Sequence, residues 1–439
     1  MDRDAIVDYF RAYEGFKPTI LKRELEVSVD SESIITIMGP RRAGKTYYMF
    51  HLMGLFNDVI YISFDDYRLN TIKYDELEDV IEIYTELYGI KPKVLFLDEI
   101  QEVPKWELAV RTFHNLKKYK IFITGSSSKM LSREIATQLR GRTLSYLLLP
   151  FSFREYLNAV KTEVGKDPGK EKISDLKRHL RDYLEFGGFP KVIFENEKIG
   201  TLREYSDLIL FKDFVERHNI KNTNLARYLH ESIIQNFSRE ISVNSLFEKA
   251  RASSIKVTKS TVYDYLNGLQ DTVFFFFVGR YSKKVHLRAS WPKKVYLADT
   301  GLSKIARFSE DTGRLMENAV FLELMRRRNI NRLLDIYYLN DQKGEVDFLL
   351  KKADKITQLI QVTYELNSEN MKRKTESLIR ASEALKCDSL IIITWDREEI
   401  LTINKKKIVV IPLWKWLTQA LCLGINHDGK RPPFAAGRI

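Results

Sequence analysis

A glycine-rich loop near the amino terminus constrains the fold of this chain more than any other stretch. The loop fits the pattern G-x-x-x-x-G-K-[ST] over residues 39–46. Residues 34–38 before it are apolar and β-branched, as in a buried strand, and residues 47–53 after it contain no Gly or Pro, as in the first turns of a helix. A strand, a glycine loop and a helix in this order predict a phosphate-binding loop.

The residue types of the loop suit a nucleoside triphosphate. Glycines let the backbone curl so that its N–H groups point at phosphate oxygens, and the helix N-terminus adds a partial positive charge. Lys45 is expected to reach the β- and γ-phosphates, and Thr46 to bind Mg²⁺. We therefore predict ATP and Mg²⁺ as ligands, with the nucleotide held by Gly39, Pro40, Arg41, Arg42, Ala43, Gly44, Lys45, Thr46 and Tyr47.

The length and charge of the chain limit its class. Its 439 residues are enough for two or three domains, and no apolar run is long enough to predict a membrane-spanning helix. The acidic first residues do not resemble a signal peptide, and Cys387 and Cys422 have no metal-ligand spacing, which together favour the cytoplasm. A net charge of +12 and a pI near 9.3 favour a polyanionic partner, most simply nucleic acid, although such a charge also serves plain solubility.

Predicted strands and helices alternate over the first 150 residues or so. This alternation predicts a parallel sheet with helices on both faces, in which sites lie at the carboxyl ends of the strands. We therefore expect the glycine loop, the pair Asp98 and Glu99, and residues 124–128 to meet at one edge. The strands are expected at 34–38, 59–64, 94–99, 120–124 and 143–149, and the helices at 2–14, 75–88, 105–118 and 129–139.

The polar residues at these strand ends have chemistry that suits hydrolysis of a phosphoanhydride. Asp98 is expected to hold Mg²⁺ directly or through water. Glu99, one residue on, could orient or deprotonate the attacking water. Thr124 or Ser126 could hydrogen-bond the γ-phosphate or that water, and the sequence leaves the choice between them open.

Five short motifs together resemble one family. Residues 39–46 read G-P-R-R-x-G-K-T, 97–101 L-D-E-I-Q, 124–127 T-G-S-S, 141–142 G-R and 150–155 P-x-S-F-x-E. With these motifs, residues 30–156 resemble the ATPase core of the AAA+ superfamily in a prokaryotic and archaeal branch. The resemblance implies a core over 1–156 followed by a helical lid over 157–239, where the branch has the turn G-G-F-P at 187–190 and K-D at 212–213.

The AAA+ resemblance also gives a role to an arginine. The superfamily often places an arginine just before its fifth strand, where it reaches the nucleotide of a neighbouring subunit. Arg142 stands at that point, with Arg140 as the second choice, which implies a homo-oligomer. Such an arginine is worth roughly 10³–10⁵ in rate. An ordinary surface arginine is the alternative.

Residues 240–299 resemble a winged helix-turn-helix. Short helices are expected at 243–251 and 258–269, with Thr258 as N-cap, followed by strands at 273–278 and 294–297. The segment 279–294 between the strands has six basic residues and no acidic one, with Tyr281 and Trp291 available to stack on bases. Protein packing within an oligomer is the alternative to DNA. The predicted nucleic-acid contacts are Arg280, Lys283, Lys284, Arg288 and Lys259.

Residues 300–423 resemble the restriction-endonuclease fold. A helix opening at Glu317, strands at 333–339, 344–350, 358–363, 389–394 and 409–413, and a helix at 368–386 follow its order. Its metal site needs an acidic residue on the helix, an Asp on one strand and Glu-x-Lys on the next. Glu317 and Asp347 match, but Gln361 is a weak ligand and Thr363 carries no positive charge, so nuclease activity is not expected. The domain is then expected to serve packing or DNA holding, and the tail 424–439 to be disordered or lightly held.

The first functional hypothesis is an ATPase that couples Mg-ATP turnover to binding of nucleic acid, most simply DNA. Two alternatives come from other classes. One is a slow, nucleotide-gated switch that binds protein partners, and the other is an ATP-dependent nuclease. The fold class expected throughout is α/β, with a P-loop AAA+ core, a helical lid, a winged helix and a nuclease-like α/β domain.

Overall fold

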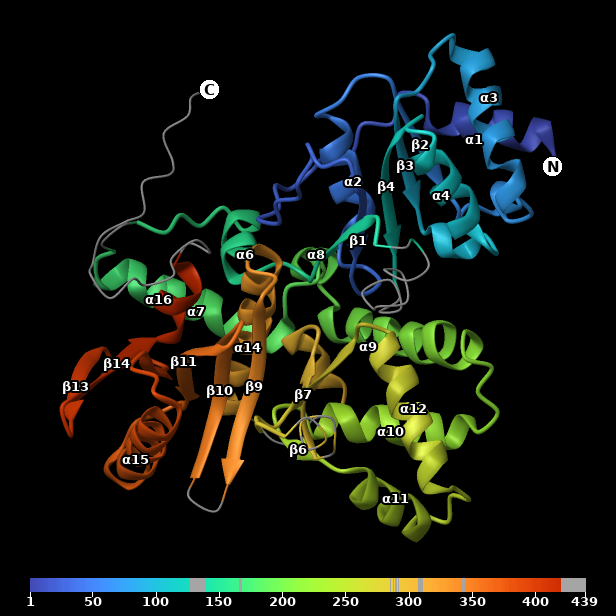
Figure 1. Cartoon of the computed structure of the whole chain (residues 1–439). Helices are drawn as coiled ribbons and strands as arrows, with labels where there is room; N and C mark the ends of the chain where they lie inside the picture. Colours follow the sequence, from blue (N-terminus) through green and yellow to red (C-terminus); the bar gives the residue numbers. More distant parts are fainter. Residues whose placement is uncertain are drawn as a thin grey trace.

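The computed structural model describes residues 1–126, 139, 141–165, 168–284, 286, 288, 290, 292–306, 311–341 and 344–419. Most of the helix predicted over 129–139, together with Arg140, Trp291, Cys422 and the tail 424–439, lies outside these residues. Figure 1 shows an α/β unit that carries the N-terminus. The green and yellow helices lie below this unit, and a second sheet in orange and red lies beside them.

The first unit is built on a fully parallel five-stranded sheet of order β2-β3-β4-β1-β5. Leu95 and Leu97 pack on one face with α1, α3 and α4, while Val94 and Phe96 pack on the other with α2, so the strands are apolar without alternation. The predicted parallel α/β core is therefore confirmed. Its elements are α1 (Arg3–Tyr13), β1 (Ile34–Met38), α2 (Lys45–Met53), β2 (Val59–Ser63), η1 (Tyr67–Leu69), η2 (Tyr74–Glu76), α3 (Leu77–Tyr88), β3 (Val94–Asp98), η3 (Ile100–Glu102), α4 (Trp106–Asn115), β4 (Lys120–Gly125) and β5 (Thr143–Leu147).

The next segment is helical, as the pattern over 172–238 predicts. Its first helix begins with a capping box in which Ser152 accepts from the backbone N–H of Glu155 and Glu155 accepts from that of Ser152. Gly188 is required at the turn because a Cβ there would lie 2.3 Å from the carbonyl oxygen of Phe151. The helices are α6 (Phe153–Ala159), α7 (Lys170–Phe186), α8 (Pro190–Phe194), α9 (Lys198–Leu208), the π-helix η5 (Ile209–Glu216) and α10 (Thr223–Gln235).

A small antiparallel sheet of order β6-β8-β7 follows, with two helices before its hairpin. Thr258 accepts a hydrogen bond from the backbone N–H of Thr261, as the predicted N-cap should. The expected start of the first hairpin strand at 273 is wrong, because Val273 has a φ of 58° and the strand begins at Phe275. The elements are β6 (Glu240–Ile241), which is too short to predict, α11 (Val243–Ala252), α12 (Lys259–Asp271), β7 (Phe275–Gly279) and β8 (Lys293–Leu297).

The C-terminal part has a mixed six-stranded sheet of order β13-β14-β12-β11-β10-β9, which confirms the expected sheet-rich α/β domain. Its first long helix begins earlier than the expected residue 317, because Asp311 caps it. Strand β13 was not predicted. The elements are η6 (Thr300–Ile305), α14 (Thr312–Ile330), β9 (Leu334–Asp341), β10 (Gly344–Lys352), β11 (Lys355–Val362), α15 (Ser368–Leu385), β12 (Leu390–Thr394), β13 (Glu399–Ile403), β14 (Lys406–Pro412) and α16 (Leu413–Thr418).

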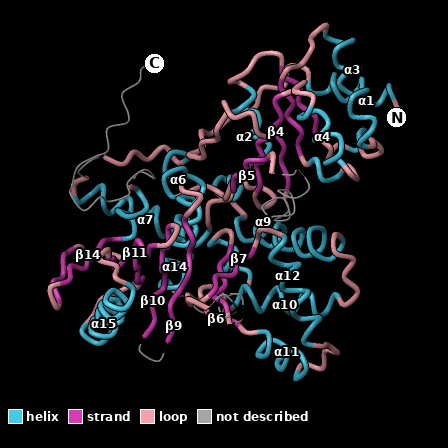
Figure 2. The backbone as a smooth tube through the Cα atoms, viewed as in Figure 1, coloured by secondary structure: helices cyan, strands magenta, loops and turns pink. Residues whose placement is uncertain are grey.

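Helix α14 connects all of these parts. It contacts β5 of the first sheet, α7, β8 of the small sheet, and β9 and β11 of the second sheet. Figure 2 shows the cyan helix α14 beside the magenta strands β9 and β10. One buried apolar cluster runs from Leu147 through the helical segment and the small sheet to Leu417. This cluster crosses the borders predicted at 239 and 299, whereas the two buried clusters on the faces of the first sheet lie within residues 6–148. Among the described residues, no helix combines the length and apolar character needed to cross a bilayer.

Candidate nucleotide site

The glycine loop lies between the carboxyl end of β1 and the start of α2. Gly39 is required because a Cβ there would lie 1.9 Å from the carbonyl oxygen of Leu148, the residue after β5. Gly44 has a φ of 93°, in the left-handed region that favours glycine, and caps α2 at Lys45. The N-terminus of α2 therefore opens at the loop.

Lys45 is held inside the loop and is only 5% exposed. Its Nζ lies 3.2 Å from Oε1 of Glu99, and it donates to the carbonyl oxygens of Gly39 at 3.3 Å and Pro40 at 3.4 Å. The predicted phosphate-binding lysine and the predicted water-orienting carboxylate are thus in direct contact.

Asp98 ends β3 as a carboxylate that is 2% exposed. It accepts hydrogen bonds from the hydroxyls of Thr46 at 2.7 Å and Tyr61 at 2.8 Å, and from Thr124. Burial, and then the charge of Glu99, raise the pKa of Asp98. A buried carboxylate whose partners in this set are neutral hydroxyls lacks a compensating cation.

The pair Asp98 and Thr46 fits Mg²⁺. Both offer hard oxygen atoms, which lie 2.7 Å apart, and Mg²⁺ usually takes one or two protein oxygens while phosphates and waters complete its shell. Within the described ranges, no group of three His, Cys, Asp or Glu side chains could hold a metal ion by itself. A Mg²⁺ ion at this point would therefore have to be shared with a nucleotide.

Glu99 follows β3 in a left-handed conformation with a φ of 51°, which is rare for residues other than glycine and concentrates at functional sites. Its backbone N–H donates to Oγ1 of Thr124 at 2.9 Å. Burial alone would raise the pKa of Glu99, but the charge of Lys45, the hydrogen bond from Gln101 and the charge of Arg41 lower it to about 2. The side chain is therefore an ionised carboxylate next to the loop.

The two polar residues at the end of β4 have different surroundings. Thr124 donates to Asp98 and accepts from the backbone N–H of Glu99, so it orients the acidic pair. Ser126 instead accepts from Nη2 of Arg217 at 3.2 Å. Of the two hydroxyls that the sequence could not distinguish, that of Ser126 is the one in contact with the helical segment.

Two contacts join the helical segment to the glycine loop, and a third contact lies beside them within the helical segment. Nε of Arg41 lies 2.8 and 2.9 Å from the two carboxylate oxygens of Asp213, which belongs to the π-helix η5. Arg217 lies 3.2 Å from the same carboxylate, and Arg42 stacks over the ring of Tyr205. Sequence reasoning did not find Arg217, although its spacing of four residues from Asp213 on a helix was a usable signal.

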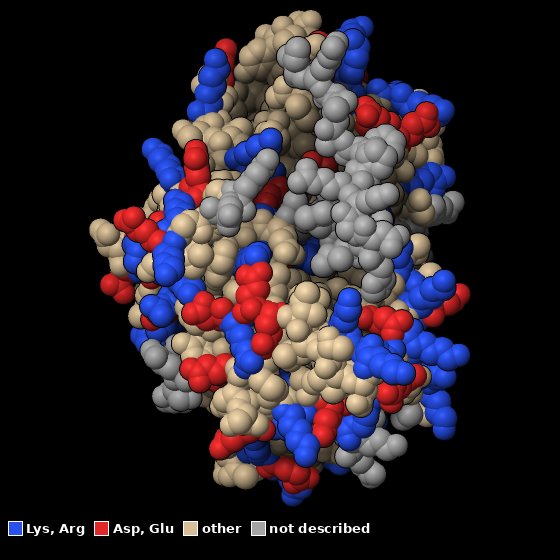
Figure 3. Space-filling model, turned by 90° about the vertical axis from the view of Figure 1, so that its left-hand side faces the viewer, with Lys and Arg blue, Asp and Glu red and all other residues tan. Residues whose placement is uncertain are grey.

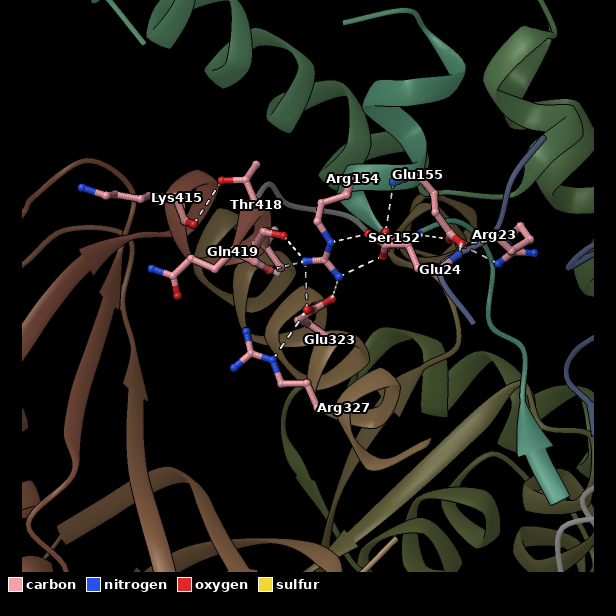
Figure 4. A network of polar contacts seen from close by, with 11 residues as sticks. Arg23, Glu24, Ser152, Arg154, Glu155, Glu323, Arg327, Lys415, Thr418 and Gln419 are labelled. Atoms are coloured by element: carbon pink, nitrogen blue, oxygen red, sulfur yellow. Dashed lines mark hydrogen bonds and ion pairs between the residues drawn. The ribbon is translucent and has the colours of Figure 1, made fainter. Parts of the chain in front are cut away.

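Arg23 is a second residue that sequence reasoning missed, and it supports the loop from behind. Its Nη1 donates to the carbonyl oxygen of Ala43 at 2.9 Å, and its Nε pairs with Oε1 of Glu155 at 2.9 Å (Figure 4). Glu155 is the last residue of the P-x-S-F-x-E motif, so this motif fixes the loop through Arg23. No local pattern marks Arg23, because its partner lies 132 residues away.

The network in Figure 4 continues from the loop to the C-terminal part. Ser152 donates to Glu24, and Glu24 pairs with Arg154. Arg154 also pairs with Glu323 of α14 at 3.0 Å and donates to the carbonyl oxygens of Leu417 and Gln419. The same motif therefore anchors α14 and α16 to the unit that carries the glycine loop.

Arg142 lies away from the glycine loop. Its carbonyl accepts from the backbone N–H of Ile34, and Thr143 pairs with Ile34 at the amino ends of two parallel strands. The loop lies at the opposite ends, and a five-residue strand spans roughly 16 Å. Arg142 is therefore not brought to the nucleotide site of its own chain.

The predicted nucleic-acid residues are only partly free for such contacts. Lys283, Lys284 and Lys259 are exposed, and Arg280 is exposed while donating to the carbonyl oxygen of Asn340. Arg288 is half-buried and donates to the carbonyl oxygen of Ser282 at 3.1 Å.

Two details of the basic segment differ from the expectation. The ring of Tyr281 packs against Tyr337, so it is not free to stack on a base. Lys294 is buried in contact with Glu317 and Asp347, the two carboxylates matched to a metal site, so it is not a phosphate-binding residue.

The Arg23–Glu155 pair gives a test of how the loop is supported. Replacing Arg23 with Met leaves a buried, uncompensated carboxylate, which should lower the free energy of unfolding at pH 7 by about 3–5 kcal/mol. Burial opposes ionisation of Glu155, but the charge and hydrogen bonds of Arg23 lower the pKa of Glu155 below its ordinary 4.5. The contribution of this pair is therefore present above pH 4.5 and disappears as the pH falls further.

Urea unfolding of the wild type and of Arg23→Met from pH 7 to pH 3 measures the difference between their free energies of unfolding. This difference should become smaller as the pH approaches 3. The double variant Arg23→Met/Glu155→Gln is the control and should regain much of the loss. A deficit that is independent of pH and unchanged in the double variant would contradict the ion-pair account.

Comparison with known proteins places this site in a family. Residues 31–157 match the AAA domain, and residues 177–311 and 312–416 match two domains of unknown function, DUF8612 and DUF4143. The uncharacterized protein MJ1544 of Methanocaldococcus jannaschii is 37% identical over 411 residues, covering 91% of both chains. An uncharacterized protein of Haemophilus influenzae is 26% identical over 398 residues, covering 88% of this chain and 94% of its own.

Among solved structures, Cdc6p from Pyrobaculum aerophilum is 11% identical over 73% of this chain and 98% of its own, with a TM-score of 0.28, which carries no conclusion about function. The match to an AAA domain and the similarity to MJ1544 are sufficient to classify the chain without this solved structure. The chain therefore belongs to the family of MJ1544, and its residues 31–157 match an AAA domain.

Proposed function

We propose that the protein binds and hydrolyses Mg-ATP and couples this turnover to binding of DNA. The proposal rests on one connected group of contacts. Lys45 pairs with Glu99, Thr46 donates to Asp98, and Thr124 contacts both of these acidic residues. These residues come from the glycine loop after β1 and from the ends of β3 and β4, so they lie at the carboxyl ends of neighbouring parallel strands. Such an arrangement would activate water against a bound γ-phosphate.

The contacts support a sequence of exchanges at the loop. Nζ of Lys45 would leave Glu99 for the more strongly charged phosphates. Glu99 would then lose the cation that lowers its pKa most and become a better acceptor of the proton of water. A Mg²⁺ ion bound with the nucleotide would neutralise phosphate charge, and Thr46 and Asp98 are the residues that would hold it.

The helical segment would report the state of the nucleotide. Arg41 and Arg217 share the carboxylate of Asp213; Arg41 belongs to the glycine loop, and Arg217 donates to Ser126 at the end of β4. A triphosphate would compete with Asp213 for these guanidiniums. Binding and hydrolysis would then alter the contact between the loop and η5, as expected for a lid.

Substitution at Glu99 and Lys45 separates binding from turnover. Glu99→Gln should still bind ATP but lose about 10²-fold or more in hydrolysis, because the proton acceptor is gone. Lys45→Ala should lose nucleotide binding. A fluorescent ATP analogue measures binding, and phosphate release measures turnover.

Glu102→Gln is the matched control, because Glu102 is an exposed carboxylate three residues further along and should leave both readouts unchanged. Wild-type turnover in Glu99→Gln would remove Glu99 from its role. Undetectable multiple turnover in the wild type, with and without DNA, would favour the slow protein-interaction switch.

Support for DNA as the partner comes from the exposed basic residues of the hairpin and α12, a segment interpreted as a winged helix. On the face shown in Figure 3, Lys and Arg side chains are interspersed with Asp and Glu over most of the described surface. A local cluster is therefore needed to bind a phosphate backbone. Lys283 and Lys284 form an exposed pair in the segment that joins β7 to β8, which has no acidic residue.

Binding to DNA should depend steeply on salt. Lys283→Ala/Lys284→Ala should lower the slope of log affinity against log salt by about 2, one for each lost phosphate contact. Fluorescence anisotropy with single- and double-stranded DNA at several salt concentrations measures the slope. Lys117→Ala/Lys118→Ala removes the same charge from the exposed surface of the core and should leave the slope unchanged. Absent or salt-insensitive binding would contradict the proposal.

We also propose that the protein acts as a homo-oligomer in which Arg142 reaches the nucleotide of a neighbouring chain. The position of Arg142, at the opposite edge of the sheet from the loop of its own chain, supports this. Arg142→Ala should lower turnover by roughly 10³-fold or more. Mixing it with Lys45→Ala should restore part of the activity, because each variant supplies what the other lacks.

A mixture of Glu99→Gln and Lys45→Ala is the control, since both changes damage the same nucleotide site and mixing should restore nothing. Recovery of activity is measured by phosphate release after the variants have exchanged subunits. A fully active Arg142→Ala variant, or no recovery in the first mixture, would show that Arg142 is an ordinary surface residue.

A further inference from the structure

A buried ion cluster lies where β8, α14 and β10 meet, far from the glycine loop. Its centre is Nζ of Lys294, a residue that is 3% exposed. The ammonium lies 2.7 Å from Oε1 of Glu345, 3.1 Å from Oε1 of Glu317 and 3.1 Å from Oδ1 of Asp347. The hydroxyl of Tyr296 donates to Glu317 at 2.7 Å.

A second lysine completes the cluster from α15. Nζ of Lys374 lies 2.7 Å from Oε1 of Gln361 and 3.2 Å from Oδ2 of Asp347, and it donates to the carbonyl oxygen of Val362. The backbone N–H of Val362 also donates to Oδ2 of Asp347 at 2.9 Å. Both carboxylate oxygens of Asp347 are therefore paired with cations.

A divalent ion does not fit among these residues. A nuclease of the fold that this domain resembles would hold a metal ion between the residues at positions 317, 347 and 361. Here the ammonium of Lys294 already lies between the carboxylates of Glu317 and Asp347. The carboxylate oxygens surround it at hydrogen-bond lengths, well beyond the 2.0–2.1 Å or so of Mg²⁺ ligands. The amide of Gln361 is also committed, since its oxygen accepts from Lys374 and its nitrogen donates to the carbonyl oxygen of Glu345.

Burial explains why the chain has to supply a cation. Glu317 and Asp347 lie in the interior, and a carboxylate without a partner costs several kcal/mol there. In a metal-dependent site the ion would compensate these charges. Here the ammonium of Lys294 does so, and because it is covalently part of β8 it cannot be removed by chelation.

We propose that Lys294 replaces the divalent metal ion of the C-terminal site, so that the site is a metal-independent ionic junction between the small sheet and the six-stranded sheet, not a nuclease centre. The junction fixes the hairpin against the second sheet. Two backbone contacts beside it agree with this role: Arg280 forms a β-bridge with Tyr338, and the N–H of Tyr281 donates to the carbonyl oxygen of Tyr338 at 2.7 Å. The inference does not depend on ATP hydrolysis.

The test is metal binding by the full chain in a Lys45→Ala/Asp98→Asn background, which removes the expected Mg²⁺ site at the loop. In this background, the protein with Lys294 intact should bind no Mn²⁺ through Asp347, and its thermal midpoint should be equal in EDTA and in millimolar Mn²⁺. Lys294→Met, of similar length but without charge, should lose several degrees in EDTA and recover in Mn²⁺, with one Mn²⁺ bound per chain by calorimetry.

Two further variants give the controls. Lys294→Met/Asp347→Asn should not recover in Mn²⁺, because the ligand is gone, and Lys293→Met, the neighbouring lysine on β8, should show no Mn²⁺ dependence. Mn²⁺ binding or DNA cleavage that requires Asp347 in the protein with Lys294 intact would overturn the proposal. A Lys294→Met variant as stable as its parent in EDTA would also overturn it. If Lys294→Met does not fold even in Mn²⁺, the Mn²⁺ titration of the protein with Lys294 intact tests the proposal, and binding that requires Asp347 would overturn it.

Discussion

The pairing of Arg154 with Glu323 is the interaction on which the arrangement of the molecule most depends. Glu323 is 1% exposed on α14, and its carboxylate is reached by Arg154 at 3.0 Å and by Arg327 at 3.6 Å. The same guanidinium binds Glu24, which lies between α1 and β1, and the carbonyl end of α16. Breaking a buried pair of this kind costs about 3–5 kcal/mol, because one charge is left without a partner. One arginine thus holds the core, α14 and the C-terminal part together.

Helix α14 extends this link in both directions. Asn329 near its end accepts from the backbone N–H of Leu147 and donates to its carbonyl, so it takes the place of a neighbouring strand at the edge of β5. Near its start, Glu317 contacts Lys294 on the small sheet. A rigid helix therefore spans from the sheet that carries the glycine loop to the hairpin that carries the exposed lysines. If hydrolysis alters the position of the core, α14 is the element through which the change would reach the hairpin.

Local patterns were sufficient for the core and for the contacts within it. Apolar runs followed by Lys45, Asp98 and Thr124 predicted both the strands and the edge at which those residues meet, because the carboxyl ends of parallel strands adjoin by geometry. The sequence could not predict Arg23, whose partner is 132 residues away. It misplaced Lys294 for a related reason: a run of basic residues shows charge but not which carboxylates fold against each of them. Strand β13 was not predicted because its residues Glu399–Ile403, at the edge of the sheet, are only partly buried and give a weak apolar signal.

Lys45 and Lys294 show that a lysine can change partners in one environment and keep fixed ion pairs in another. Lys45 faces one carboxylate and two neutral carbonyl oxygens, a set that a triphosphate with several negative charges can displace. Lys294 faces three carboxylates from two elements, and its departure would leave the two buried ones, Glu317 and Asp347, without this cation. The difference lies in the number of compensated charges and not in the lysine. A cation held by one carboxylate can move to an arriving ligand, whereas a cation that neutralises two buried carboxylates becomes part of the fold.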